Sequence, residues 1–446
     1  MALSPAPQRP IDRALSLAAA QEPASALRYA LPVLQLEPTA ALPLFVVGHA
    51  LAALGRRELA ARALKAAGRR AIAISSLPLA VASAAELRTL GEDVAPLLDA
   101  MATAFGRGSP RLRDRRLGPP ELPGVLADFA PLQDTVSEEE LERQASELLT
   151  AAEAALEAGS EEAAKTPLSP QPLFSSLTPE SLREMIAIFE VQVLAAGATL
   201  VQEGTVGAEA FIVARGELDV QRQAPREGDP PLHLARLGAG SLVGEMALLS
   251  RAPRAATVVT VRPSVILVGH KAALDGVVAR VPQVGQQFAE HCKRRMVDNL
   301  VRTSALFRAA SPAERSSLVE RFGVRTFEPG ESLIKQGQNS EGLHLIASGE
   351  VSIVHQDQED RTLLTKLGPG DVAGEVALLL RRPAIADAIA QHPTVTLFLP
   401  ADRLFDLLRA HPKVFADLYE LAVQRDQETA SVAREEATQG EDFVFI

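Results

Sequence analysis

Two oppositely charged residues, Glu245 and Arg254, stand nine positions apart on either side of a polar corner. An apolar run leads into Gly244 and Glu245, and the corner presents Arg254 just before the small residues Ala255 and Ala256. An arginine fork suits an anionic group such as a phosphate, and an ionised glutamate accepts hydrogen bonds from hydroxyl groups. The small residues would let the backbone approach a ligand closely. The alternative is an ordinary sheet turn with a surface arginine and glutamate.

The whole stretch from Leu242 to Val258, LVGEMALLSRAPRAATV, resembles the phosphate-binding cassette of cyclic nucleotide-binding domains. The family pattern is Gly-Glu-apolar-Ala-Leu and then Pro-Arg-Ala-Ala-Thr, with the same spacing between Glu and Arg. The resemblance implies that Glu245 binds the ribose 2′-hydroxyl and that Arg254 binds the exocyclic phosphate oxygens. Backbone N–H groups would complete the phosphate cradle. The implied cyclic nucleotide-binding residues are Gly244, Glu245, Met246, Ala247, Arg254, Ala255 and Ala256.

From Leu173 onward the chain repeats itself. LFSSLTPE at Leu173 matches LFRAASPA at Leu306, an offset of 133 (306 − 173), and the offset falls to 130 at the cassette (375 − 245). Each copy has short alternating segments bounded by glycines, which indicate an antiparallel β-roll or barrel. The resemblance implies an eight-stranded jelly roll with helices at both ends, extending from residue 173 to about 425.

The second copy of the cassette, AGEVALLLRRPAIADAI, lacks the arginine. Ala384 takes its position, and Asp387 replaces a threonine of the first copy. A pocket with two carboxylates and no cation would bind a phosphate poorly, and Arg381 and Arg382 are expected on the outer corner of the turn. We therefore expect no cyclic nucleotide binding of the usual kind here, and a structural role for Glu375 as an acceptor of N–H groups. The degenerate second site comprises Gly374, Glu375 and Ala384.

The residue after the cassette arginine bears on which nucleotide binds. Family members that prefer cGMP tend to carry Thr or Ser there, whereas this chain has Ala255. The resemblance therefore favours cAMP. It also implies that an apolar side chain from the following helix covers the base, and the candidates are Phe288, Met296 and Leu300. Core packing is the alternative role for each of the three.

Residues 12–105 have the apolar spacing of helices, with Ala, Leu and Val recurring at three- and four-residue steps. The pattern resembles tetratricopeptide repeats, because the small and apolar positions of that motif are occupied by Gly48, Leu51, Ala60, Leu64 and Ala67. The resemblance implies a helical groove that docks a protein partner. The alternative is a plain helical bundle.

The expected fold class is α+β multidomain, an N-terminal all-α helical repeat region followed by two jelly-roll β-roll domains with flanking helices. Residues 106–172 form a linker with one acidic helix, which Ser137 caps and Glu140 joins in a capping box. The expected domains are the helical region at 12–105, this linker, the two rolls at 173–303 and 304–428, and an acidic tail at 429–446.

Composition excludes several functions. The net charge of −11 argues against nucleic-acid binding, and no segment approaches the ~20 apolar residues of a membrane span. A single cysteine, Cys292, forms no internal disulfide and is compatible with a cytoplasmic location. The histidines lack metal-ligand spacing, and no catalytic motif is present, so we expect neither a metal nor an enzyme. Abundant Ala, Leu and Arg suggest a bacterial source.

These patterns lead to the hypothesis of a cAMP-responsive adaptor that senses its ligand in the first roll and engages a protein partner through the N-terminal helices. After the second roll come one helix and an acidic tail, which leave no room for a DNA-reading domain. The linker has no Arg-Arg-x-Ser, so kinase inhibition of the pseudosubstrate kind is not expected. The alternative is a scaffold whose rolls no longer bind nucleotide.

Overall fold

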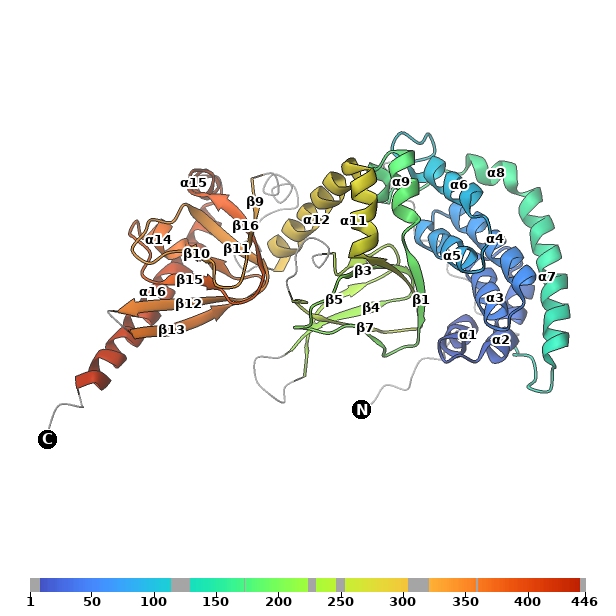
Figure 1. The fold of residues 1–446 in the computed structure, drawn as a ribbon, viewed down its shortest axis with the longest axis horizontal. Coiled ribbons are helices and arrows are strands. Elements are labelled where there is room, and N and C mark those ends of the chain that lie inside the picture. The colour runs from blue at the N-terminus through green and yellow to red at the C-terminus, as the bar shows by residue number, and fades with distance from the viewer. Residues whose placement is uncertain are drawn as a thin grey trace. The chain divides into compact units, whose positions relative to one another are not determined.

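The computed structural model describes residues 9–113, 129–171, 173–223, 230–245, 253–303, 321–357 and 360–441 (Figure 1). The chain divides into two compact units. The first comprises Met1–Gln202, Ala208–Leu248 and Ala256–Phe288, and the second comprises Glu203–Gly207, Leu249–Ala255 and Ala289–Ile446. None of the helices in the described ranges combines the length and the apolar character that a membrane crossing requires.

The N-terminal region is all helical, as predicted. Its helices are α1 (Pro10–Ala19), α2 (Pro23–Leu36), α3 (Ala41–Ala53), α4 (Arg57–Ala73), α5 (Leu77–Thr89) and α6 (Ala95–Phe105). Gly48 of α3 faces Leu64 of α4, and a Cβ at Gly48 would lie 2.7 Å from the Leu64 Cγ. The close approach of α3 and α4 therefore requires the small residue that the sequence places there. Leu51, Ala60 and Ala67 are also fully buried.

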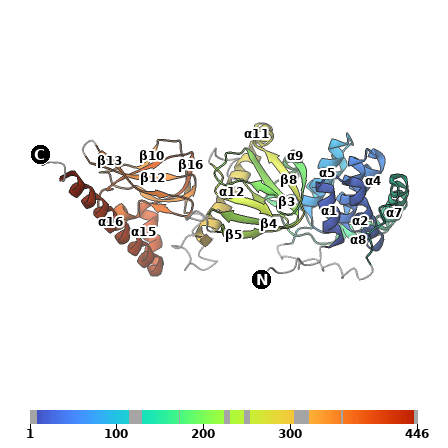
Figure 2. The same ribbon diagram turned by 90° about the horizontal axis from the view of Figure 1, so that it is seen from below.

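The acidic helix between the two regions is part of the helical layer rather than a free linker. Helix α7 (Glu138–Ala158) packs against α2 and α4, and the short α8 (Ser160–Lys165) follows it (Figures 1 and 2). The side chains that α7 buries recur at helical spacing: Leu141, Ala145, Leu149 and Ala152. Two ion pairs of 2.7 Å, Arg56–Glu142 and Arg62–Glu153, flank this apolar stripe.

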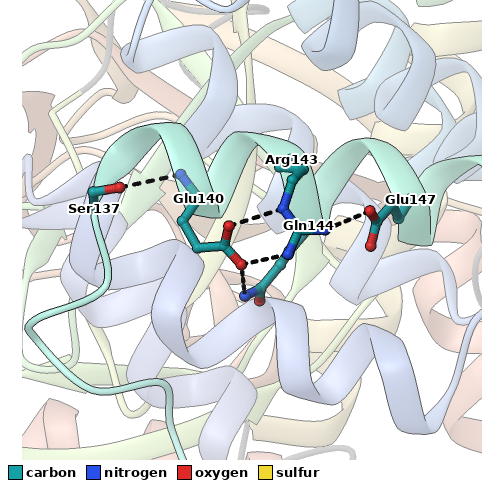
Figure 3. A network of polar contacts seen from close by, with 5 residues as sticks. All are labelled: Ser137, Glu140, Arg143, Gln144 and Glu147. Atoms are coloured by element: carbon teal, nitrogen blue, oxygen red, sulfur yellow. Dashed lines mark hydrogen bonds and ion pairs between the residues drawn. The ribbon is translucent and has the colours of Figure 1, made fainter.

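The start of α7 confirms half of the predicted capping box. Ser137 accepts a hydrogen bond from the backbone N–H of Glu140 at 3.3 Å, as an N-cap does (Figure 3). The Glu140 carboxylate does not accept the second hydrogen bond of the box, from the backbone N–H of Ser137. It accepts hydrogen bonds from the side chains of Arg143 and Gln144 instead. The hydrogen bond from Arg143 is the main reason why the pKa of Glu140 falls to about 2. A guanidinium three residues along the helix thus outcompetes the cap.

The first roll is an antiparallel sandwich of two four-stranded sheets. One sheet has the order β1 (Glu190–Leu194), β8 (Ser264–His270), β3 (Glu209–Arg215) and β6 (Leu242–Val243). The other has the order β2 (Thr199–Val201), β7 (Thr257–Thr260), β4 (Leu218–Arg222) and β5 (Leu232–Leu237). Between them lies an apolar core that includes Phe211, Val213, Leu218, Val258 and Ile266.

The second roll repeats this topology strand for strand. One sheet has the order β9 (Gly323–Phe327), β16 (Thr394–Pro400), β11 (Gly342–Ser348) and β14 (Val372–Ala373). The other has the order β10 (Ser332–Ile334), β15 (Asp387–Ala390), β12 (Val351–Asp357) and β13 (Asp360–Leu367). The strand starts reproduce the two sequence offsets, 133 from β1 to β9 (323 − 190) and 130 from β7 to β15 (387 − 257). The internal duplication and the jelly-roll fold are therefore confirmed.

Helices flank both rolls. The first roll is preceded by a 3-10 turn (Phe174–Ser176) and α9 (Pro179–Ile186), and it is followed by α11 (Lys271–Arg280) and α12 (Pro282–Thr303). The second contains α14 (Glu375–Leu379) and is followed by α15 (Ala401–Ala410) and α16 (Pro412–Glu441). Helix α16 continues through much of the expected acidic tail. The resemblance also implies a helix before the second roll, and residues 304–320 there lie outside the described residues.

Within the first unit, the helical region docks on the β1–β8–β3–β6 sheet of the first roll. Helix α5 packs against β1, β3 and β8, and α1 packs against β1. At this contact Asp12 is buried and pairs with Arg215 and, at 3.1 Å, with Arg262. Burial lowers the pKa of the Arg215 guanidinium, and the Asp12 carboxylate opposes that effect. The two ion pairs therefore join residues 203 (215 − 12) and 250 (262 − 12) positions apart in the chain.

Replacing Asp12 with alanine should destabilise the first unit by about 3–5 kcal/mol, because the change leaves a buried guanidinium without its carboxylate. Urea unfolding of the full chain, followed by circular dichroism, measures the effect. The matched control removes the exposed pair Lys65–Glu92 through Glu92→Ala, which should cost under about 1 kcal/mol. Equal effects of the two substitutions would contradict a structural role for the Asp12 contact.

The second roll buries a neutral histidine. His344 is 2% exposed, lies between Phe327 and Phe398, and is 3.1 Å from the Thr396 hydroxyl. Burial, with a smaller contribution from the charge of Arg325, lowers the pKa of His344 from 6.5 to about 4. The unfolded chain therefore binds a proton between these pH values and the folded chain does not.

The stability that neutral His344 contributes should be complete above pH 6.5 and should fall as the pH decreases towards about 4, by up to about 3 kcal/mol. Urea unfolding between these pH values measures it. In His344→Gln, which retains a hydrogen-bonding group, this part of the pH dependence should disappear. The exposed His392 provides the control substitution, and identical pH profiles for wild type and His344→Gln would refute the assignment.

Candidate functional site

The first half of the first cassette follows strand β6. The strand ends at Val243, and Gly244 adopts a φ of +75°, a conformation that glycine tolerates far better than other residues. Glu245 follows directly and is 8% exposed, so its carboxylate is withdrawn from solvent. The predicted residues Met246 and Ala247 lie outside the described residues.

The second half of the cassette leads into strand β7. Arg254 is 9% exposed, and its backbone pairs with the segment before β3 through two hydrogen bonds of 2.8 Å. In these bonds the Arg254 N–H donates to the carbonyl of Thr205, and the Gly204 N–H donates to the carbonyl of Arg254. A Cβ at Gly207 would lie 2.5 Å from an Arg254 guanidinium nitrogen. A side chain at position 207 would therefore clash with this guanidinium. Ala255 is exposed, and Ala256 is half-buried.

One of the three candidate residues for covering the base can be placed. Phe288 is 3% exposed and faces a small space lined by Leu173, Phe189 and Leu274. It therefore packs in the core of the first unit, which is the alternative role for this position. The side chains of Met296 and Leu300 lie outside the described residues.

The second cassette is described in full. Gly374 has a φ of +99°, and its neighbour Glu375 begins α14 with 2% of its surface exposed. Both residues and Ala384 line one cavity of about 120 Å³. Arg425 of α16 also lines this cavity, and its Nη1 donates to Glu375 Oε1 and to the carbonyl of Val372, each at 2.6 Å.

The prediction that the second pocket has no cation is wrong, and its second carboxylate is Glu428 of α16 rather than the predicted Asp387. Arg425 supplies a cation, from a helix 41 residues beyond Ala384 (425 − 384). Asp387 accepts a hydrogen bond from the backbone N–H of Gln336 at 2.7 Å and does not line the cavity. Glu375 thus has a guanidinium partner in addition to any N–H groups. A basic residue on the helix after the roll was visible in the sequence, but helical spacing alone does not indicate which side chain reaches back.

The two arginines of the turn lie outside this cavity, as expected. Arg381 occupies the turn with a φ of +51°, and Arg382 forms an ion pair with Asp426 of α16. Burial raises the pKa of Glu375, and the attraction of Arg425 opposes the rise. The cavity therefore has a buried carboxylate whose ionised form is favoured mainly by Arg425.

Comparison with known proteins finds one family in both rolls. The family model described as "Cyclic nucleotide-binding domain" matches residues 191–280 and 324–411, which lie in the two rolls. Each match includes a cassette, the one with Arg254 and the one with Ala384.

Curated relatives include regulatory subunits of cAMP-dependent protein kinase. That of Colletotrichum orbiculare is 28% identical over 232 residues, 51% of this chain and 57% of the relative. The type II subunit of Drosophila melanogaster is 29% identical over 238 residues, 53% of this chain and 59% of the relative. The chain thus spans somewhat over half the length of these relatives.

Among solved structures, the regulatory domain of Toxoplasma gondii PKA with cAMP is 22% identical and covers 57% of this chain and 92% of that one. Its TM-score of 0.28 is too low to carry a conclusion.

One expectation is wrong and another has no support. The bacterial source suggested by composition is contradicted by the eukaryotic relatives, since a bias towards Ala, Leu and Arg does not specify an organism. The comparisons also give no support to the tetratricopeptide resemblance of the helical region. They agree with the fold and with both cassettes, and the two β-rolls of this chain belong to the cyclic nucleotide-binding domain family.

Proposed function

We propose that the chain is a non-enzymatic, cytoplasmic regulatory adaptor that binds cAMP in its first roll and signals to a protein partner. The observation that carries the proposal is Arg254, a buried arginine at the cassette position of a roll that matches the family model. A buried guanidinium suits a compact anion because the two charges offset each other's desolvation. The relatives are named for cAMP-dependent kinases, which favours the same ligand.

The proposed roles follow from the chemistry of the side chains. Arg254 binds the exocyclic phosphate oxygens, and Glu245 accepts a hydrogen bond from the ribose 2′-hydroxyl. Backbone N–H groups near Gly244, Ala247 and Ala255 complete the phosphate cradle. The close fit of Gly207 against the guanidinium supports a fixed orientation of Arg254.

The N-terminal helices are the proposed route to the partner. Helices α1 and α5 pack on the sheet that contains β3 and β6, so a shift of this sheet would also shift the helices. A ligand that binds one arrangement of roll and helices better than another shifts the population by its differential affinity. The helical region also offers a groove of about 260 Å³ beside the 2.8 Å pair of His49 and Glu86, where a partner would dock.

Replacing Arg254 with alanine in the full chain should weaken cAMP binding by some tens- to thousands-fold, because losing one member of a buried charge pair costs about 2–5 kcal/mol. Isothermal titration calorimetry measures the change. Arg236→Ala is the matched control, because Arg236 is an exposed arginine of the same roll that pairs with Glu217. Unchanged affinity in Arg254→Ala would favour the scaffold alternative.

The identity of the nucleotide can be tested at Ala255. Replacing Ala255 with threonine should raise the affinity for cGMP by about tenfold relative to cAMP, because a hydroxyl beside the base adds a hydrogen bond worth about 1 kcal/mol or more. Competition between the two nucleotides on wild type and variant gives the ratio. Ala256→Ser, one position further on, is the control, and an equal shift in both variants would exclude a specific role for position 255.

A further inference from the structure

A wide groove of about 730 Å³ opens on the second roll beside α14, α15 and the start of α16. Its floor is apolar, because the buried Leu378 and Leu408 and the rings of Phe405 and Phe415 line it. Phe415 is 43% exposed and lies against the equally exposed Tyr419, with 5.8 Å between the ring centroids. The volume is that of a ligand cleft, and exposed aromatic rings beside such a cleft are typical of an interaction surface.

Three arginines line the same groove: Arg381, Arg382 and Arg409. Arg382 pairs with Asp426, and Arg409 forms a 2.9 Å pair with Asp406 on an exposed face of α15, where water weakens the attraction. Arg381 is exposed and has no acidic partner among the described residues. A partner that suits this groove therefore combines aromatic side chains with acidic ones.

The chain contains a segment of this chemistry. Residues 441–446, which we call the acidic–aromatic segment, have the sequence EDFVFI. Glu441 is the last residue of α16, and residues 442–446 lie outside the described residues. The two carboxylates of the segment match the arginines of the groove in charge, and its two phenylalanines match the apolar floor.

The acidic–aromatic segment cannot reach the groove of its own chain. Phe415 and Glu441 both belong to α16 and are 26 positions apart (441 − 415), a distance of about 39 Å along a helix. The five residues after Glu441 span at most about 18 Å when fully extended. Figures 1 and 2 show the last turns of α16 extending beyond the strands of the second roll, away from the start of the helix. Only another copy of the chain can therefore supply this segment to the groove.

We propose that the acidic–aromatic segment of one chain binds the groove of the second roll in a second copy, and that reciprocal exchange of the two segments forms a two-fold dimer. In an extended segment, alternate residues share a side, so Phe443 and Phe445 together contact the apolar floor. Asp442 then pairs with Arg381. This contact is separate from the cAMP site proposed for the first roll.

Sedimentation velocity of the full-length chain tests the dimer. Wild type should be dimeric at about 100 µM, and the double variant Phe443→Ala/Phe445→Ala should dissociate at least about tenfold more readily. Arg381→Glu should have the same effect, because it turns an attraction into a repulsion. Arg361→Glu is the matched control, because Arg361 is an exposed arginine of β13 in the same roll and does not line the groove.

A labelled synthetic peptide with the sequence of residues 440–446 tests the groove itself. Its fluorescence anisotropy should rise on binding to the Phe443→Ala/Phe445→Ala chain, and adding Arg381→Glu to that chain should weaken binding by about tenfold or more. Circular dichroism of each variant separates a lost contact from a lost fold.

Three outcomes would each overturn the proposal. They are a wild-type chain that is monomeric at about 100 µM, a dimer that persists in Phe443→Ala/Phe445→Ala, and a peptide that binds equally well with Arg381→Glu and with Arg361→Glu. A dimer lost in Arg381→Glu alone would assign the groove to a different part of the second copy. Affinity for cAMP should be equal in all these variants, so failure of the first-roll site would appear separately.

Discussion

A guanidinium buried in a β-roll must be matched by an anionic or polar partner, and this requirement separates the two halves of the duplication. In the first roll the buried arginine belongs to the cassette itself, at Arg254, and we propose a compact anion as its ligand. In the second roll the cassette has lost its arginine, and Arg425 enters from α16 to pair with Glu375. The two copies of the fold therefore take their buried arginine from different elements, the cassette in the first roll and α16 in the second.

The same constraint ties the helical region to the first roll. Asp12 lies in the first helix and is buried, and it is matched by Arg215 and Arg262 from the roll. Breaking such a contact is costly, so the helices and the first roll are expected to behave as one body within the first unit. In the proposed function, this contact would transmit a change in the roll to the helices without a flexible joint.

Much of the fold could be predicted from the sequence because it depends on local patterns. Glycine turns and alternating strands marked both rolls, and the offsets of 133 and 130 residues recur in the strand starts. The site was less predictable, since cassette spacing locates Glu375 and Ala384 but says nothing about Arg425, which reaches the pocket from another helix. The packing of α7 on α2 and α4, and the Asp12 contact across 250 residues, are likewise tertiary. Local capping misled us at Glu140, where Arg143 provided a stronger partner than Ser137.

The central claim is that the first roll of the tandem pair binds a cyclic nucleotide and that the second, which has Ala384 in place of the cassette arginine, does not. The stoichiometry of cAMP binding to the full-length chain, measured by isothermal titration calorimetry at saturating ligand, tests this most directly. The account predicts one cAMP per chain. Two equivalent sites, or none, would contradict it.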